Sequence, residues 1–347
     1  KEIIHILRDP ATLVFALMIP LIQLIIFGYA IDLDVRHIGT VVVDQDHSRE
    51  SRTYVEKLKA TQYIDVIRYA RSPGEAEDLM RSGQAKIGIV IPAGFARDYN
   101  AGRPAQVGVM IDGSDSTIAM RARSAFVVPS PTTTGIDARI NVLFNPDMST
   151  QVFMVPGLIA VILQLVTVAL TAFSLVRERE SGTMEQLMVS PIGKFGLMTG
   201  KIAPYAVIGF IEVAVVLLFG WLLFDVRVTG SLMLLMGLSL PFLVATLGFG
   251  LLISTMAATQ AQALQLTLLF TMPSILMSGF AFPRETQPGI LYLISDALPV
   301  THYLDIVRGI IVRGAGFFDL WPSVVALLII AGVTVLLSVF RFRKSLA

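Results

Sequence analysis

The stretch RERESGTMEQLMVSP, Arg177–Pro191, decides the architecture of this chain because it joins two long apolar runs, residues 152–176 and 202–224. Each run is at least as long as the roughly 20 apolar residues that a helix needs to cross a lipid bilayer. A short connection between two membrane spans needs little charge of its own. The density of Arg and Glu here therefore favours a surface that a soluble partner recognises.

Thr183 and Gln186 give the same stretch a helix start, because they fit a capping box with Thr183 as the N-cap. Glu185 lies in the first turn, where the helix dipole stabilises a negative charge, and Pro191 ends the helix. We expect a short helix over residues 181–191 that lies along the membrane face. The competing interpretation is a charged loop that only anchors the ends of two spans.

Composition indicates a membrane protein, since 54% of the 347 residues are hydrophobic and only 15% are charged. Soluble domains carry about 25% charged residues. Six segments are long and apolar enough to cross a bilayer. They are residues 11–30, 152–176, 202–224, 232–256, 261–282 and 320–340.

Basic residues near the ends of these segments set the predicted orientation, because cytoplasmic loops carry an excess of Lys and Arg. With the N-terminus inside, the cytoplasmic side holds Lys1, Arg8, Arg177, Arg179, Lys194, Lys201, Arg341, Arg343 and Lys344. The short outer loops hold Arg227, Arg284, Arg308 and Arg313. We therefore expect both termini in the cytoplasm.

Residues 32–150 differ from the rest of the chain because they are rich in charged residues. Strand-like runs alternate there with capped helical segments, which is typical of an α/β domain. The predicted strands are residues 38–44, 63–69, 85–91 and 105–112, and the predicted helices are residues 48–60, 72–82, 94–100 and one that opens at Ser114 or Asp115. The turn-rich residues 127–135 predict a linker or a gap in the chain.

The predicted fold class is therefore an α-helical membrane protein with six transmembrane helices, plus an inserted α/β extracytoplasmic domain. Residues 1–31 form an amphipathic elbow helix and the first span, residues 32–150 the α/β domain, and residues 151–347 the other five spans. Within the last region, residues 283–316 hold two apolar patches that are too short to span. We expect a re-entrant or interfacial segment there, on the outer side.

Two motifs in this sequence resemble those of type 2 ABC exporter permeases. One is Arg177–Pro191, and the other is LPVTHYLDIVRGIIVRG at residues 298–314, before the last predicted span. The large outer domain between the first two spans is similar to that of the bacterial multidrug-export subgroup. The resemblance implies a permease of the bacterial cytoplasmic (inner) membrane that exports hydrophobic or amphiphilic, drug-like compounds.

The resemblance also implies partners. The helix at residues 183–190 would be a coupling helix on a separate ATP-binding subunit, which would hold the ATP and magnesium. A second permease chain, identical or related, would complete the pump, and a periplasmic adaptor with an outer-membrane channel would be further partners. The residues implied to couple to the ATPase are Arg177, Glu178, Arg179, Glu180, Gly182, Thr183, Glu185, Gln186 and Pro191.

Enzymatic functions find little support in the sequence. It has no cysteine and neither an HExxH nor a GxSxG motif, so we predict no catalytic residue and no metal site. The run GLMTGK at residues 196–201 has three residues between its glycines, where a phosphate-binding loop has four, and Ile202 replaces the Ser or Thr that would hold magnesium. A net charge of +1 argues against nucleic acid as a partner.

Glu212 is the carboxylate that lies deepest in a predicted span, where an exposed charge is costly. It is a candidate for the transport path, and the alternative is a protonated or hydrogen-bonded group in a helix contact. His302, Asp305 and Arg308 are candidates for an outer gate, because Asp305 and Arg308 have the spacing to pair on one helix face. The alternative for these three is a solvated interfacial face.

Two other readings stay open at this point. An ABC-type permease could export an envelope lipid or glycan instead of drug-like compounds. A non-transport membrane sensor or scaffold would have no requirement for ATP.

Overall fold

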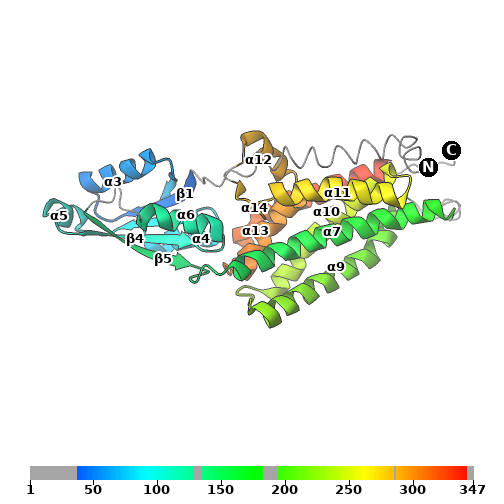
Figure 1. Ribbon diagram of the computed structural model, residues 1–347, viewed down its shortest axis with the longest axis horizontal. Helices are drawn as coiled ribbons and strands as arrows, with labels where there is room; N and C mark the ends of the chain where they lie inside the picture. Colours follow the sequence, from blue (N-terminus) through cyan, green and yellow to red (C-terminus); the bar gives the residue numbers. More distant parts are fainter. Residues whose placement is uncertain (1–36, 128–134, 183–193, 285–286, 342–347) are drawn as a thin grey trace, which may run out of the picture.

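The computed structural model describes residues 37–127, 135–182, 194–284 and 287–341. They form an α/β domain and a bundle of long helices, which follow one another along the longest axis of the molecule (Figure 1). The predicted elbow helix and first span, residues 1–31, lie outside the described residues.

A five-stranded mixed sheet forms the centre of the α/β domain. Its strands are β1 (Ile38–Asp44), β2 (Ile64–Tyr69), β3 (Ile87–Ile91), β4 (Ala105–Asp112) and β5 (Ile136–Leu143), in the spatial order β2-β1-β3-β4-β5. Strand β1 is parallel to β2 and β3, β3 is antiparallel to β4, and β4 is parallel to β5.

Helices cover both faces of this sheet, because its strands alternate their apolar side chains between the two faces. Helices α3 (Arg49–Ala60), α5 (Phe95–Asn100) and α6 (Ser116–Val127) pack on the face that carries Ile38 and Val42. Helix α4 (Pro73–Arg81) packs on the face that carries Val41 and Val43.

The predicted elements of the α/β domain are confirmed from β1 to α6, with ends that move by one or two residues. At α4, Ser72 Oγ accepts from Glu75 N at 3.2 Å and Glu75 Oε2 accepts from Arg71 N at 2.8 Å. Strand β5 was not predicted. Its residues Ile136, Ala138, Ile140 and Val142 alternate with polar ones, so the period-2 signal is present directly after the turn-rich stretch.

In the described part of the chain, seven helices follow the sheet. They are α7 (Thr150–Glu180), α9 (Lys194–Phe224), α10 (Leu232–Met256), α11 (Gln260–Met277), α12 (Gly289–Asp296), α13 (Pro299–Ile311) and α14 (Phe317–Arg341). The main core of the bundle is formed by α7, α9, α10, α13 and α14. A smaller apolar cluster joins α7, α10 and α11.

Four of the described helices are long and apolar enough to cross a membrane, namely α7, α9, α10 and α14. Helices α12 and α13 would make a fifth crossing if they are one span with a 79° bend. Helix α11, predicted as a span over residues 261–282, has only 18 residues and is not among the four. The predicted count of six spans is therefore not confirmed.

Helix α13 lies inside the bundle instead of on its surface. Its residues from Pro299 to Ile311 are buried except for His302 and Asp305. Tyr303 stacks on Phe242 of α10 with ring centroids 4.1 Å apart, and its hydroxyl lies 2.7 Å from Ser239 Oγ. Helix α13 is thus buried in the bundle, whereas α12 exposes Ile290 and Leu293. The predicted re-entrant or interfacial placement of this segment relative to the membrane stays a prediction.

Candidate functional site

The predicted coupling surface begins in the last turn of α7. This helix continues to Glu180, whereas the predicted span ends at residue 176. Arg177 to Glu180 are the last residues of this helix, and Gly182, with φ +71°, follows its C-cap. Ser181 and Gly182 form a turn, so the predicted helix over residues 181–191 does not include them. Its other predicted residues, Thr183, Glu185, Gln186 and Pro191, lie outside the described residues.

The end of α7 holds the turn between α10 and α11. Arg179 Nη1 donates to the carbonyl oxygen of Ala257 at 2.7 Å. Glu180 Oε1 accepts from the backbone N of Gln260 at 2.9 Å, and Oε2 accepts from the Gln260 side chain. Two residues of the predicted coupling surface therefore also fasten the end of α10 and the start of α11. Sequence reasoning missed this role of Ala257 and Gln260, because their segment carries no charge.

Glu212 lies in the middle part of α9, on a half-buried position. Its Oε2 atom is buried and makes no hydrogen bond to the described residues. Three residues earlier, a Cβ at Gly209 would lie 2.4 Å from Leu243 of α10 and 3.4 Å from Leu163 of α7. This part of α9 is therefore in close contact with both helices.

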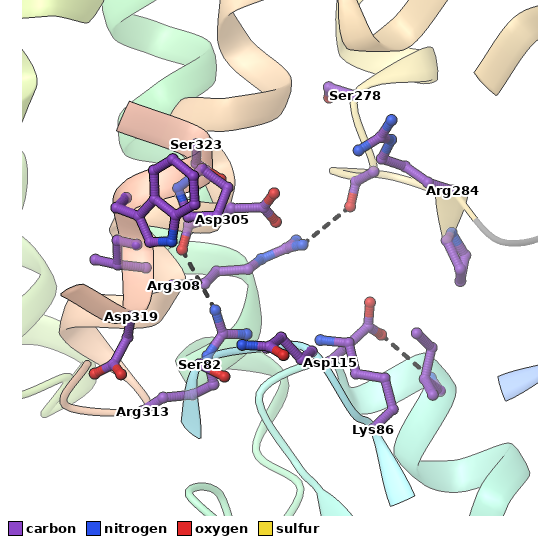
Figure 2. A pocket seen from close by; sticks show the side chains of 18 of the residues that line it. Ser82, Lys86, Asp115, Ser278, Arg284, Asp305, Arg308, Arg313, Asp319 and Ser323 are labelled. Carbon is purple, nitrogen blue, oxygen red and sulfur yellow. Dashed lines mark hydrogen bonds between the residues drawn. The ribbon is translucent and has the colours of Figure 1, made fainter. Parts of the chain in front are cut away.

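A polar cavity of about 340 Å³ lies between the α/β domain and the bundle. Figure 2 shows Lys86 and Asp115 reaching it from the domain, and Asp305, Arg308 and Arg313 from α13 and the turn that follows it. Ser278 and Arg284, after α11, and Asp319, at the start of α14, complete its charged and polar wall. The cavity thus unites two of the three predicted gate residues.

Arg308 does not pair with Asp305, contrary to the prediction. It is 8% exposed, its Nη1 donates to the carbonyl oxygen of Gly279 at 3.0 Å, and its guanidinium lies 4.3 Å from the centre of the Phe153 ring. Asp305 is exposed. The i, i+3 rule describes helix surfaces, and burial of α13 turns Arg308 into the bundle. His302 does not line the cavity, and its Nε2 lies 2.8 Å from the carbonyl oxygen of Asp296.

Asp112 forms a buried ion cluster behind this cavity. Its fully buried carboxylate lies 3.1 Å from Lys86 Nζ and 3.8 Å from Arg313 Nη1. Burial alone would raise the pKa of Asp112, but the positive charges of Lys86 and Arg313 and the hydrogen bond from Ser114 hold it below its ordinary value. The residues of this cluster come from the domain and from the end of α13, so it joins the two parts. Of its members, Arg313 alone is named from the sequence, as one of the basic residues in the outer loops.

The described residues contain no group of three His, Cys, Asp or Glu side chains that could hold a metal ion.

Comparisons with known proteins agree with this architecture. The family model of the ABC-2 family transporter proteins matches residues 10–340. The chain is 28% identical to the probable multidrug ABC transporter permease YbhR of Escherichia coli K12 over 99% of its length and 96% of that protein. It is 30% identical to the probable multidrug ABC transporter permease YbhS of the same strain, over 90% and 87% of the two chains. It is 21% identical to the linearmycin resistance permease protein LnrN of Bacillus subtilis, over 96% and 95%.

These relatives are membrane permeases that align along nearly the whole chain, including the α/β domain. Family membership and the apolar helices imply a multi-pass protein of the inner membrane. They also imply that ATP hydrolysis belongs to a separate ATP-binding subunit, so the chain is a transport subunit and not an enzyme. The chain belongs to the ABC-2 transporter family and has the role of an ABC permease.

Proposed function

We propose that the chain is the permease subunit of an ATP-driven exporter that moves hydrophobic or amphiphilic, drug-like compounds out of the cell. The names of the relatives support the substrate class, since two are described as probable multidrug permeases and one as a linearmycin resistance permease. The α/β domain would lie outside the cell membrane and both termini inside, as the basic residues near the span ends favour.

The observation that carries the proposal is the connection at the end of α7. Arg179 and Glu180, which adjoin the predicted coupling helix, bind the backbone at both ends of the α10–α11 turn. A push from an ATP-binding subunit on this end of α7 would reach three helices at once. Such a connection suits a pump better than it suits a passive scaffold.

Two copies of the chain, or one copy and a related permease, would form the transport pathway between them with two ATP-binding subunits. Glu212 would lie beside this pathway, and Asp305 and Arg308 would line its outer end. A periplasmic adaptor and an outer-membrane channel would receive the exported compound in a cell with two membranes.

The proposal is tested in proteoliposomes that contain the permease with its ATP-binding subunit. We expect ATP-dependent transport of an amphiphilic dye, and we expect Glu185→Arg to abolish it while the protein still inserts and the complex still hydrolyses ATP. ATP-dependent movement of a lipid or glycan, with no movement of any amphiphilic dye, would reassign the substrate. A permease that binds no ATP-hydrolysing subunit would contradict the proposal.

A further inference from the structure

Several charged side chains line the polar cavity between the α/β domain and the bundle, and not all of them have an ion-pair partner. Lys86 and Arg313 share the single carboxylate of Asp112, which leaves that group with a net positive charge, and Arg284 pairs with Asp296. Among the residues that the structure describes, this leaves the cation Arg308 and the carboxylates of Asp115, Asp305 and Asp319 without an ion pair. One cation and several anions therefore face one cavity without being paired to each other.

Arg308 is the cation that makes no ion pair with a described residue, although Asp115 and Asp305 attract it from beyond contact distance. It is more than nine-tenths buried, and its one hydrogen bond among the described residues goes to a neutral carbonyl. Its Nε and Nη2 atoms find no acceptor there. Figure 2 shows its side chain extended across the space between α13 and the segment of Ser278 and Arg284. Because a buried charge with no anion in direct contact is costly, a ligand that brings an anionic group to Arg308 would be favoured.

The carboxylates that line the cavity without an ion pair would attract a positively charged group of a ligand. Asp305 is exposed on α13, and Asp319 lies in the first turn of α14, where its Oδ2 accepts from Gly316 N at 2.8 Å. Asp115 caps α6 through Thr117 N and Ile118 N. None of these contacts neutralises a carboxylate, so a ligand cation beside them would be attracted.

The cavity also opens where the helices change from a polar to an apolar surface. Phe318 is 87% exposed and Trp321 is 56% exposed at the start of α14, and both line the cavity. On the neighbouring α12, Tyr292 lines the cavity and Leu293 is exposed. Aromatic side chains gather at the membrane–water interface, and a polar cavity at that level faces lipid headgroups. The volume of about 340 Å³ is within the range of about 300–1,000 Å³ found for ligand pockets.

We propose that this cavity binds a phospholipid headgroup that carries both a phosphate and an ammonium group. The phosphate lies beside Arg308, the ammonium beside Asp305 and Asp319, and the acyl chains leave past Phe318 and Trp321. This inference does not depend on which compound the permease transports. A soluble molecule with the same two groups shares this chemistry, so the test separates the two sources.

The experiment uses the full permease with its ATP-binding subunit in nanodiscs that contain equal amounts of phosphatidylethanolamine and phosphatidylglycerol. Native mass spectrometry counts the lipids that each complex retains. We expect the wild-type protein to retain phosphatidylethanolamine about tenfold over phosphatidylglycerol, which corresponds to one charge-assisted hydrogen bond. Equal retention of the two lipids would overturn the proposal.

Three variants locate the binding. Asp305→Asn, an exposed position that does not endanger folding, is expected to remove most of the preference for phosphatidylethanolamine. Arg308→Gln is expected to reduce retention of both lipids. Arg227→Gln is the matched control, because Arg227 is 74% exposed, pairs with Asp225 and does not line the cavity. Selective retention that is the same in Asp305→Asn as in the wild-type protein would overturn the assignment to this cavity.

Competition with glycerophosphoethanolamine, which lacks acyl chains, identifies the source. If it displaces the retained lipid, the headgroup alone supplies the affinity and a soluble zwitterion is an equally good occupant. If it does not, while the preference persists, the ligand is a membrane lipid held also by its chains. Both outcomes support recognition of the phosphate and ammonium pair.

Discussion

Asp112 Oδ2 lies 3.8 Å from Arg313 Nη1, and this ion pair joins the last strand residue of β4 to the turn after α13. The carboxylate is fully buried and Arg313 is 7% exposed. The pair therefore connects the α/β domain to the bundle at a point that solvent screens little. Lys86 contacts the same carboxylate oxygen, at 3.1 Å, so two cations share one acidic group.

Asp112→Asn is expected to destabilise the protein by about 3–5 kcal/mol, because removing one partner leaves buried charge uncompensated. The free energy of unfolding in detergent, measured by chemical denaturation, checks this value. Asp137→Asn is the control, since Asp137 is 48% exposed in its pair with Arg139 and exposed pairs contribute at most about 1 kcal/mol. Equal losses in the two variants would contradict the assigned role of Asp112.

Acid should weaken the same contact. The pKa of Asp112 is lower in the folded protein than its ordinary value of 3.8, so the unfolded chain binds its proton at a higher pH than the folded one. The contribution of Asp112 to stability is therefore complete above about pH 4 to 5, and it is lost as the pH falls from there through the lower, folded-state pKa. Hydrogen exchange of the β4 amides between pH 5 and 3 should show this loss. Asp112→Asn should flatten the pH dependence, and an unchanged slope in that variant would contradict the assignment.

Glu180→Ala is expected to uncouple ATP hydrolysis from transport. It removes both contacts to Gln260 and leaves Arg179 as the remaining link to the turn. We expect at least a severalfold fall in compound moved per ATP hydrolysed, measured in proteoliposomes. The control is Ser181→Ala, because among the described residues the Ser181 hydroxyl bonds only to the carbonyl oxygen of Arg177 in the adjoining helix. An unaltered ratio in Glu180→Ala would remove Glu180 from the coupling route.

Glu212→Gln should separate a role in substrate binding from a role in packing. The substitution keeps the shape and removes the charge, so a packing role predicts no change in transport. If Glu212 lies beside the pathway, transport of cationic dyes should fall while that of neutral dyes persists. Val215→Ala, at an exposed position one turn farther along α9, controls for general effects on this helix. Equal effects on cationic and neutral dyes would exclude recognition by charge.

Gly157 in α7 allows a close approach of the Phe280 ring. A Cβ at this position would lie 2.4 Å from Phe280 Cδ2, so Gly157→Ala is expected to cost about 1–3 kcal/mol of stability through overpacking. Gly237 in α10 has no atom within 4 Å of an added Cβ. Gly237→Ala should be neutral or stabilise by up to about 1 kcal/mol, because it lowers the chain entropy of the unfolded state. Thermal unfolding of the two variants compares them directly.

The sequence was sufficient for the local structure of the α/β domain because caps and periodicity are local signals. Ser72 and Glu75 placed a helix, and the run from Ile38 to Asp44 placed a strand. Strand β5 has an equally regular alternation, but the turn-rich residues before it favoured a linker. The sequence predicts that the span ends at Val176, because charged residues follow it. In the structure these charged residues continue helix α7.

Contacts between distant parts of the chain could not be predicted. The spacing of Asp305 and Arg308 allows an ion pair, but in the structure Arg308 contacts Gly279 and Phe153, which come from the segment after α11 and from α7. The pairing of Asp112 with Arg313 has no local sequence signal either. Such contacts depend on how α13 packs into the bundle, which hydropathy alone does not determine.

The length of helix α10 determines how far a tilt at one of its ends moves the other end. With 25 residues, it is about 37 Å long at the usual rise per residue. It is held near one end by Arg179 at Ala257, and toward the other by the Ser239–Tyr303 contact with α13. A helix of this length that tilts as one body, across its internal Pro241, by about 10° displaces its far end by about 6 Å. A small rotation at the α10–α11 turn is therefore amplified into a displacement comparable to one helical turn beside α13.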